Sequence, residues 1–158
     1  MAKVDTKLGN VYSVDLTQGV GLIQCVKVGG EGKFDIIRIL PGSYDKNDLS
    51  ADRLTSLVSQ KELFYTLSPI KHAVGKKMFS FIGNYAIPRG SESPKYFKNK
   101  IIVRSEFKGW HIVEEATWKR RFVQELSSEE SLLSSWGMIS VPDIVERIEN
   151  NWTPKEWK

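Results

Sequence analysis

Cysteine is almost absent from this sequence, since Cys25 is the only one among 158 residues. A single thiol cannot form an intramolecular disulfide, and it cannot supply the several ligands that a zinc site needs. Cys25 lies near Ile23 and Val26 in a predicted strand, so we expect it to be a small, buried, apolar residue.

Histidine is nearly as scarce, and the two that are present are not spaced as a catalytic pair. His72 lies in a polar stretch, and His111 lies in a predicted hairpin beside Trp110. Two histidines and Lys71 would suit acid–base cleavage of RNA, but nothing in the sequence brings them together. No group of His, Cys, Asp and Glu has metal-ligand spacing, and no serine has the flanking glycines of a nucleophile elbow. We therefore expect a binding protein without metal or cofactor, and not an enzyme.

Long hydrophobic runs are absent as well. No apolar stretch approaches the ~20 residues that span a bilayer, and residues 1–5 lack the hydrophobic core of a secretion signal. We expect no membrane contact and a cytoplasmic location. Hydrophobic residues make up 41% and charged residues 27%, as in ordinary globular proteins. We expect a single domain over residues 1–158, with its core at about 8–152 and a loosely held C-terminal tail at 153–158.

What the sequence does contain is a series of short segments with the two-residue period of a strand. Turns of hairpin length separate the first three, which predicts an antiparallel meander. The glycines at 29–32 form one of these turns and do not lead into a helix, so we do not interpret them as a phosphate-binding loop. The segment 76–84, with alternating Met78, Phe79, Ser80 and Phe81, is predicted to be the central strand. The other predicted strands are 11–16, 20–28, 34–40, 63–67, 101–104, 110–113 and 118–123, with a hairpin turn at 106–109 and a loop at 70–75.

Capping residues mark the predicted helices. They are Ser50 for a helix at 51–59, Ser127 with Glu130 for a helix that ends at Gly137, and Ser140 with Asp143 for a helix at 141–152. Ile144, Ile148 and Trp152 lie four residues apart and form the predicted buried stripe of the last helix. Together these elements predict an α+β fold. We expect a mainly antiparallel, strongly twisted β-sheet or a partly open β-barrel, with two or three short helices that cover an edge or an open end.

The net charge of +4 conceals two regions of opposite sign. Basic residues gather between 95 and 121, whereas acidic residues outnumber basic ones between 125 and 149. A basic chain with exposed aromatic side chains can bind phosphates and stack bases. A small nucleic-acid-binding β module is therefore the alternative function, although we expect nucleic acid less than protein as the partner.

Several short motifs follow one another in an order that points to a family. The central one is Phe81-Ile82-Gly83-Asn84, then Ile87-Pro88, then Pro94-Lys95-Tyr96-Phe97 after a polar loop. The opening strand at 9–14, the second strand at 21–26 and the last helix at 141–152 agree with it. In this order the motifs resemble the immunity protein 26 family of bacterial polymorphic-toxin and contact-dependent inhibition systems, over about residues 8–152. One departure is Phe79 and Phe81, where we would expect tryptophan.

The resemblance implies that this is an immunity protein, or antitoxin, which neutralises a cognate toxin domain such as a nuclease. It implies stoichiometric binding that covers the toxin's active site or blocks the path of its substrate, by a monomer or in a 1:1 complex. Such a protein has a cytoplasmic location and no catalytic residues of its own.

The residues that suit partner binding are aromatic side chains among charges, because tryptophan and arginine are over-represented as interface anchors. If the toxin is basic, we expect the glutamates of this set to bind it. If the toxin is acidic, we expect the arginines of this set to bind it, together with the basic run at 95–104. A solvated strand face is the other interpretation of the same residues. The predicted partner-binding residues are Trp110, Glu114, Glu115, Trp118, Arg120, Arg121, Glu125, Glu129 and Glu130.

Overall fold

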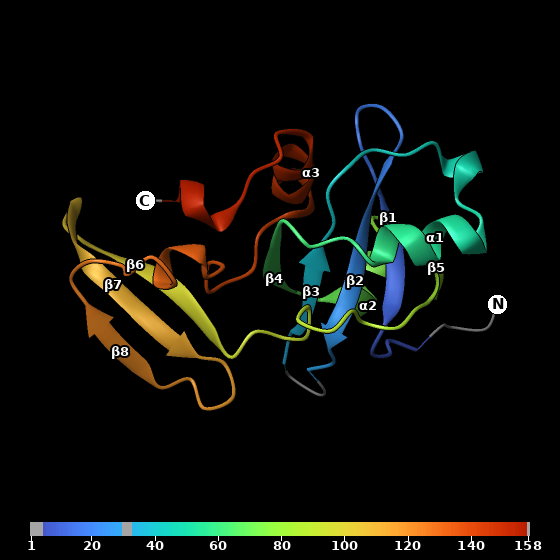
Figure 1. Cartoon of the computed structure of the whole chain (residues 1–158). Coiled ribbons are helices and arrows are strands. Elements are labelled where there is room, and N and C mark those ends of the chain that lie inside the picture. Colours follow the sequence, from blue (N-terminus) through green and yellow to red (C-terminus); the bar gives the residue numbers. More distant parts are fainter. Residues whose placement is uncertain (1–4, 30–32, 158) are drawn as a thin grey trace.

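The computed structural model describes residues 5–29 and 33–157 and has an α+β fold with two antiparallel sheets (Figure 1). The first sheet has the strand order β4-β3-β2-β1-β5 and the second has the order β6-β7-β8. The strands are β1 (Asn10–Asp15), β2 (Val20–Lys27), β3 (Asp35–Ile39), β4 (Phe64–Ser68), β5 (Ser80–Asn84), β6 (Tyr96–Val103), β7 (Glu106–Glu114) and β8 (Arg120–Val123). The predicted meander of the first three strands is confirmed, and neither sheet closes into a barrel. Most of the predicted turn at 29–32, like residues 1–4, lies outside the described residues.

Helices pack against both faces of the first sheet. Leu54 and Val58 of α1 (Ala51–Val58) join one apolar cluster, and Ile144 and Ile148 of α3 (Val141–Glu149) join another on the opposite face. Strands β2 and β3 are therefore buried on both sides, and β1 is not the half-buried strand that its sequence suggests. Among the described residues, no helix is long and apolar enough to cross a membrane.

Two predictions for residues 70–84 are wrong. Residues 70–75 form the short helix α2 (Ile70–Gly75) and not a loop, and the Asp35 carboxylate accepts a hydrogen bond from the Ile70 N–H at 3.3 Å. The predicted central strand is shorter, and β5 is an edge strand whose one partner among the described strands is β1. Phe79 is buried in the main cluster although it precedes the strand. Residue alternation indicates a strand, but it does not say which neighbours the strand will have.

The short motifs at 9–14, 21–26 and 81–84 meet at one polar site in the first sheet, where Asn10 and Gln24 are buried and Asn84 is exposed. The Asn84 side-chain amide donates to the Asn10 side chain and to a backbone carbonyl of residue 8, both at 2.9 Å. The Gln24 amide donates to the Tyr85 carbonyl at 2.9 Å and the Gly9 carbonyl at 3.2 Å. These motif residues satisfy one another's hydrogen bonds, so they hold β1, β2 and the end of β5 together.

The second sheet begins with the predicted hairpin, but its turn lies elsewhere. Arg104 and Ser105 make the turn with φ of 51° and 65°, so the predicted turn residues 106–109 belong to β7. Fully buried Phe97 then attaches this sheet to the first one, because it packs in a cluster with Val26 and Ile36 of β2 and β3.

The predicted helix between Ser127 and Gly137 is mostly absent. Its capping box forms, since the Glu130 N–H donates to Ser127 Oγ at 3.1 Å and the Ser127 N–H donates to the Glu130 carboxylate at 2.9 Å. Only a 3-10 turn follows, η2 (Glu130–Leu132). We call residues 134–138 the connecting segment, because it bonds to both sheets: the Lys98 N–H of β6 donates to the Ser134 carbonyl at 2.9 Å, and the Leu67 N–H of β4 donates to the Gly137 carbonyl at 3.4 Å. Those long-range bonds replace the predicted helix.

The predicted loose tail is docked on the second sheet at residues 153–157. The turn η3 (Pro154–Glu156) brings the Pro154 carbonyl to 2.8 Å from the Lys98 Nζ, which also donates to the Ser131 carbonyl at 2.8 Å. The Trp157 ring meets the Trp110 ring edge-on at 5.2 Å. Burial, with Lys100 nearby, lowers the pKa of Lys98 to about 8.

Candidate functional site

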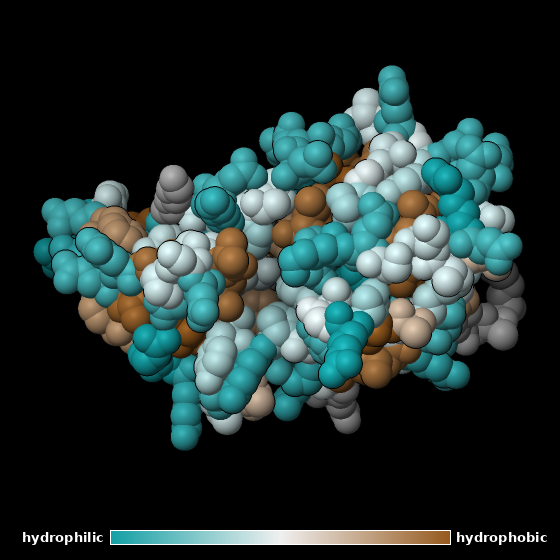
Figure 2. All heavy atoms as spheres, viewed as in Figure 1, coloured by the Kyte–Doolittle hydropathy of each residue, from teal (hydrophilic) through white to brown (hydrophobic). Residues whose placement is uncertain are grey.

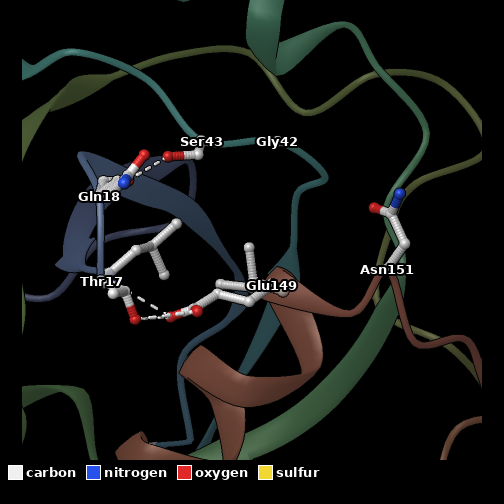
Figure 3. Close-up of a pocket in the computed structure, with 8 residues that line it drawn as sticks. Thr17, Gln18, Gly42, Ser43, Glu149 and Asn151 are labelled. Carbon is white, nitrogen blue, oxygen red and sulfur yellow. Dashed lines mark hydrogen bonds between the residues drawn. The ribbon is translucent and has the colours of Figure 1, made fainter.

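One hollow of about 440 Å³ lies between the β1–β2 loop and the end of α3 (Figure 3). The Thr17 N–H and hydroxyl donate to the Glu149 carboxylate at 3.2 and 2.9 Å, and the Ser43 hydroxyl donates to the Gln18 carbonyl. These bonds tie the loop to the helix and to residue 43. The hydrogen-bonding groups named here therefore stabilise the fold, and we assign no ligand to the hollow.

A second hollow, of about 670 Å³, contains His72 and Lys71 at the start of α2. Its carboxylate, Asp35, accepts the backbone N–H groups of Gly29 and Ile70 and so fixes the chain around α2. His111 lies on β7 of the other sheet, so the two histidines come from different parts of the fold. Among the described residues, no three His, Cys, Asp or Glu side chains group as metal ligands would.

The single thiol is buried, as predicted. Cys25 has no exposed surface, and burial, followed by the nearby Asp35 charge, raises the pKa of its thiol to about 12. A thiol with so high a pKa stays protonated at neutral pH, and the thiolate is the nucleophilic form. Cys25 is therefore a packing residue of β2.

The second sheet carries a concentration of exposed large hydrophobic side chains. Single exposed apolar residues are normal on a protein surface, but a group of them on one small sheet indicates an interaction surface. Brown hydrophobic spheres are visible on the lobe that this sheet forms, as they are on parts of the rest of the molecule (Figure 2). The exposed residues are Tyr96, Ile102, Val103, Phe107, Trp118 and Phe122.

The predicted partner-binding residues all fall on β7, on β8 or in the segments next to them, but they do not form one surface. Trp110 is only 4% exposed and lies under Trp157, so Trp118 is the exposed one of the two predicted aromatic anchors. Glu115 makes an ion pair with Lys27 of β2. Glu114 accepts a hydrogen bond from the Thr117 hydroxyl at 2.7 Å in the β7–β8 turn. These two glutamates make stabilising contacts within the fold, and both are partly buried.

Three of the predicted charged residues do converge. Arg121, Glu129 and Glu130 line a hollow of about 400 Å³ together with apolar Ile112 and Leu133. Arg121 donates to Glu130 at 2.8 Å, and the Ser127 N–H and then Arg121 lower the pKa of the Glu130 carboxyl. Glu125 is exposed beyond the end of β8. This hollow lies on one face of the second sheet.

The other face contains Arg120, and the strand register shows what surrounds it. Residues paired across antiparallel strands share a face. His111 pairs with Asn99 on β6 and with Phe122 on β8, and Arg120 lies two residues from Phe122. We call this side the Phe122 face. It combines a basic side chain with exposed aromatic area.

Trp118 adjoins the Phe122 face in an unusual backbone conformation. In the β7–β8 turn the Trp118 N–H donates to the Glu114 carbonyl at 2.7 Å, and its φ is 61°. Left-handed residues at such turns are normally glycine, because a side chain there costs about 1–2 kcal/mol. Trp118 is 65% exposed, and among the described residues its ring pairs with one other aromatic ring, that of Trp136, with ring centres 6.1 Å apart. Neither the turn nor the core explains a tryptophan at this position.

Phe122 was not among the predicted residues. It is 56% exposed, and its ring lies over Gly109 of β7, where a Cβ atom would come within 2.7 Å of the ring. Glycine inside a strand leaves room for an aromatic ring from the neighbouring strand. Gly109 was therefore the available signal, but its place between two predicted strands indicated a turn.

The chain was compared with models of protein families, with curated proteins and with solved structures, and none of these comparisons found a match.

Proposed function

We propose that this protein is an immunity protein that neutralises a cognate bacterial toxin domain by binding to it through the second sheet. The observation that carries the proposal is Trp118, a large aromatic side chain that is 65% exposed and held at a left-handed turn position where glycine fits best. Strained residues of this kind cluster at functional sites. The order of the sequence motifs, which resembles the immunity protein 26 family, supplies the class of partner.

In this proposal the first sheet supports the structure and the second sheet binds the toxin. The polar site around buried Gln24 and Asn10, which Asn84 joins from the edge strand, makes the first sheet a rigid support. The second sheet presents Trp118 and Phe122 as anchors that enter apolar pockets of the toxin, with Arg120 beside them. Rigid aromatic anchors dominate the binding energy of many interfaces, and charges at the rim increase the association rate. The bound monomer then occludes the toxin's active site or the path of its substrate.

The test first seeks a large secreted protein among the genes next to this chain and then takes the C-terminal domain of that protein as the binding partner. We expect the two to co-purify at 1:1 and co-expression to rescue growth. Trp118→Gly should retain the fold and weaken binding at least about 30-fold, the loss of about 2 kcal/mol typical of a hot spot. Leu8→Ala, an exposed apolar residue beside the first sheet, is the matched control and should bind normally.

Two results would contradict different parts of the proposal. A toxin that stays fully lethal when this chain is abundant would overturn the function. Full binding by Trp118→Gly, with growth rescue intact, would keep the function and move the interface away from the second sheet.

One observation favours the alternative of a nucleic-acid-binding module: Phe122, His111 and Arg120 share a face and could stack bases and contact phosphate. Retention of the protein on single-stranded DNA, measured against salt concentration, separates the two functions. Phosphate contacts would give a steep decrease with salt. The immunity function predicts weak retention that Trp118→Gly leaves unchanged.

A further inference from the structure

The four outer edges of the two sheets are not equivalent. The connecting segment covers two of them, because Met138 bridges to Leu67 of β4 and Ser135 bridges to Lys98 of β6. A third edge, β5, is irregular, since the β1–β5 register shifts between Val11 and Tyr12. The fourth edge is β8, which pairs with β7 in a regular register and, among the described residues, has no strand or bridge on its other side. In Figure 1 it lies at the outer edge of the second sheet.

The hydrogen bonds of the β7–β8 turn show which groups of β8 point outward. The Glu114 N–H donates to the Lys119 carbonyl at 2.9 Å, so this pair is bonded across the ladder. Bonded and non-bonded pairs alternate along antiparallel strands. Arg121 and Val123 therefore direct their N–H and C=O groups to β7, and those of Arg120 and Phe122 point away from the sheet. The exposed edge thus offers the backbone donors and acceptors of two residues.

Charge and shape around this edge favour one kind of occupant. Among the described residues, nearby Glu115 and Glu130 already have basic partners, whereas no ion pair includes Lys119 or Arg120. Phe122 adds an exposed ring on the same face as Arg120. An added strand would place alternate side chains beside Arg120 and Phe122, so acidic and apolar residues fit those places.

We propose that the free edge of β8 binds an extended acidic segment of the partner protein as an additional strand of the second sheet. This inference rests on the proposed function and specifies how the toxin domain is recognised. The backbone groups of Arg120 and Phe122 bond to the segment, a carboxylate faces Arg120, and an apolar residue packs on the Phe122 ring. In strand addition, main-chain bonds supply affinity and alternate side chains supply specificity.

Charged residues on edge strands more often prevent pairing than promote it. Exposed aromatic rings work against such protection, because they add apolar surface for any approaching strand. Here Trp118 lies in the turn that leads into β8 and Phe122 lies on β8, and both are more than half exposed. The combination suits an edge that selects its partner by charge.

The first experiment uses the acetylated and amidated peptide Thr-Glu-Thr-Tyr-Thr-Glu-Thr, whose pattern is the same in both directions. Amide hydrogen exchange of the full-length protein is followed by NMR as the peptide is added. We expect exchange to slow at the Arg120 and Phe122 amides, while those of Arg121 and Val123, already bonded to β7, change little. Unchanged exchange at Arg120 and Phe122 at saturating peptide would overturn strand addition.

The second experiment tests the charge of the occupant. A peptide with lysine in place of glutamate should bind roughly threefold to fivefold more weakly, as expected for cross-strand charge pairs. Arg120→Glu should reverse that preference, and Lys71→Glu, at an exposed lysine of helix α2, should not. An equal affinity for both peptides would overturn the acidic occupant, and so would tighter binding of an oligothymidine than of the acidic peptide.

The cognate toxin domain distinguishes this inference from the proposed function. Suppose that the toxin is neutralised, but that the Arg120 and Phe122 amides exchange as fast in the complex as in the free protein. Strand addition is then wrong, and the immunity function stands. If neither neutralisation nor binding occurs, the proposed function fails and this inference fails with it.

Discussion

Arg38 is the largest side chain that is completely buried, and its partners explain how the first sheet tolerates it. Its guanidinium donates to Gln24 Oε1 at 2.7 Å, to the Gln60 carbonyl at 3.0 Å and to the Val58 carbonyl, and Glu62 lies 3.7 Å away. Burial lowers the pKa of Arg38, an effect that the Glu62 charge opposes. The side chain thereby joins β2 and β3 to the end of α1.

At the residue scale we predict that Arg38→Ala lowers the free energy of unfolding by about 3–5 kcal/mol. The change removes a buried charged donor and leaves Gln24 and two carbonyl groups without their partner. Arg38→Met should cost less, because the methionine fills most of the volume. Urea unfolding followed by tryptophan fluorescence measures both variants. A loss below about 1 kcal/mol for Arg38→Ala would show that water replaces the guanidinium.

At the element scale, the β6–β7 hairpin has a turn whose residues do not suit its conformation. Arg104 and Ser105 both have positive φ, where Asn-Gly is the preferred pair. We predict that Ser105→Gly raises the free energy of unfolding by about 0.5–1 kcal/mol, since glycine avoids the left-handed penalty.

The matched control for this prediction is Ser80→Gly in β5, where φ is not positive. It should lower stability, because glycine loses more conformational freedom in a strand than serine does. Thermal unfolding of both variants gives the comparison, and equal shifts in the two would contradict the role of the turn.

The docked C-terminal segment gives a prediction about pH. Lys98 has an ordinary pKa of 10.5 that burial lowers to about 8 in the folded protein. Between these values the unfolded chain binds more protons than the folded one, so stability rises with pH across this window and is lost as pH falls through 8. The measurement is the free energy of unfolding against pH for the wild-type protein and for Lys98→Met. The difference between the two profiles removes the contributions of Tyr12, Tyr65 and Cys25, whose raised pKa values oppose this trend. A difference profile that is flat from pH 8 to 10.5 would show that Lys98 keeps its ordinary pKa.

At the scale of the whole molecule, the two sheets should differ in local stability. Strands β2 and β3 lie inside the first sheet and are buried on both faces, whereas β8 is short and exposed at an edge. Native-state hydrogen exchange should therefore be slowest in β2 and β3, near the limit of global unfolding, and fastest among the strands in β8. Equal protection in β8 at low protein concentration would mean that its edge is covered in the free monomer.

The sequence could identify elements where local patterns agree with the final packing. The first three strands, the Ser50 and Ser140 caps and the burial of Cys25 were predictable, because capping and alternation act over a few residues. Trp118 was identified as a candidate anchor from its charged neighbours alone. Phe122 and the edge of β8 were not identified, since both depend on the order of the strands in the sheet.

By itself, then, the sequence determined that this chain folds as antiparallel strands with a few capped helices. The signals for these elements, residue alternation and helix capping, involve residues only a few positions apart. Only the tertiary structure decided the number of sheets, the edge position of β5 and β8, and the docking of residues 153–157. Each depends on contacts between residues far apart in the sequence, such as Lys98 with Pro154 or Leu67 with Gly137. The left-handed conformation of Trp118 likewise depends on the β7–β8 register, which no local pattern specifies.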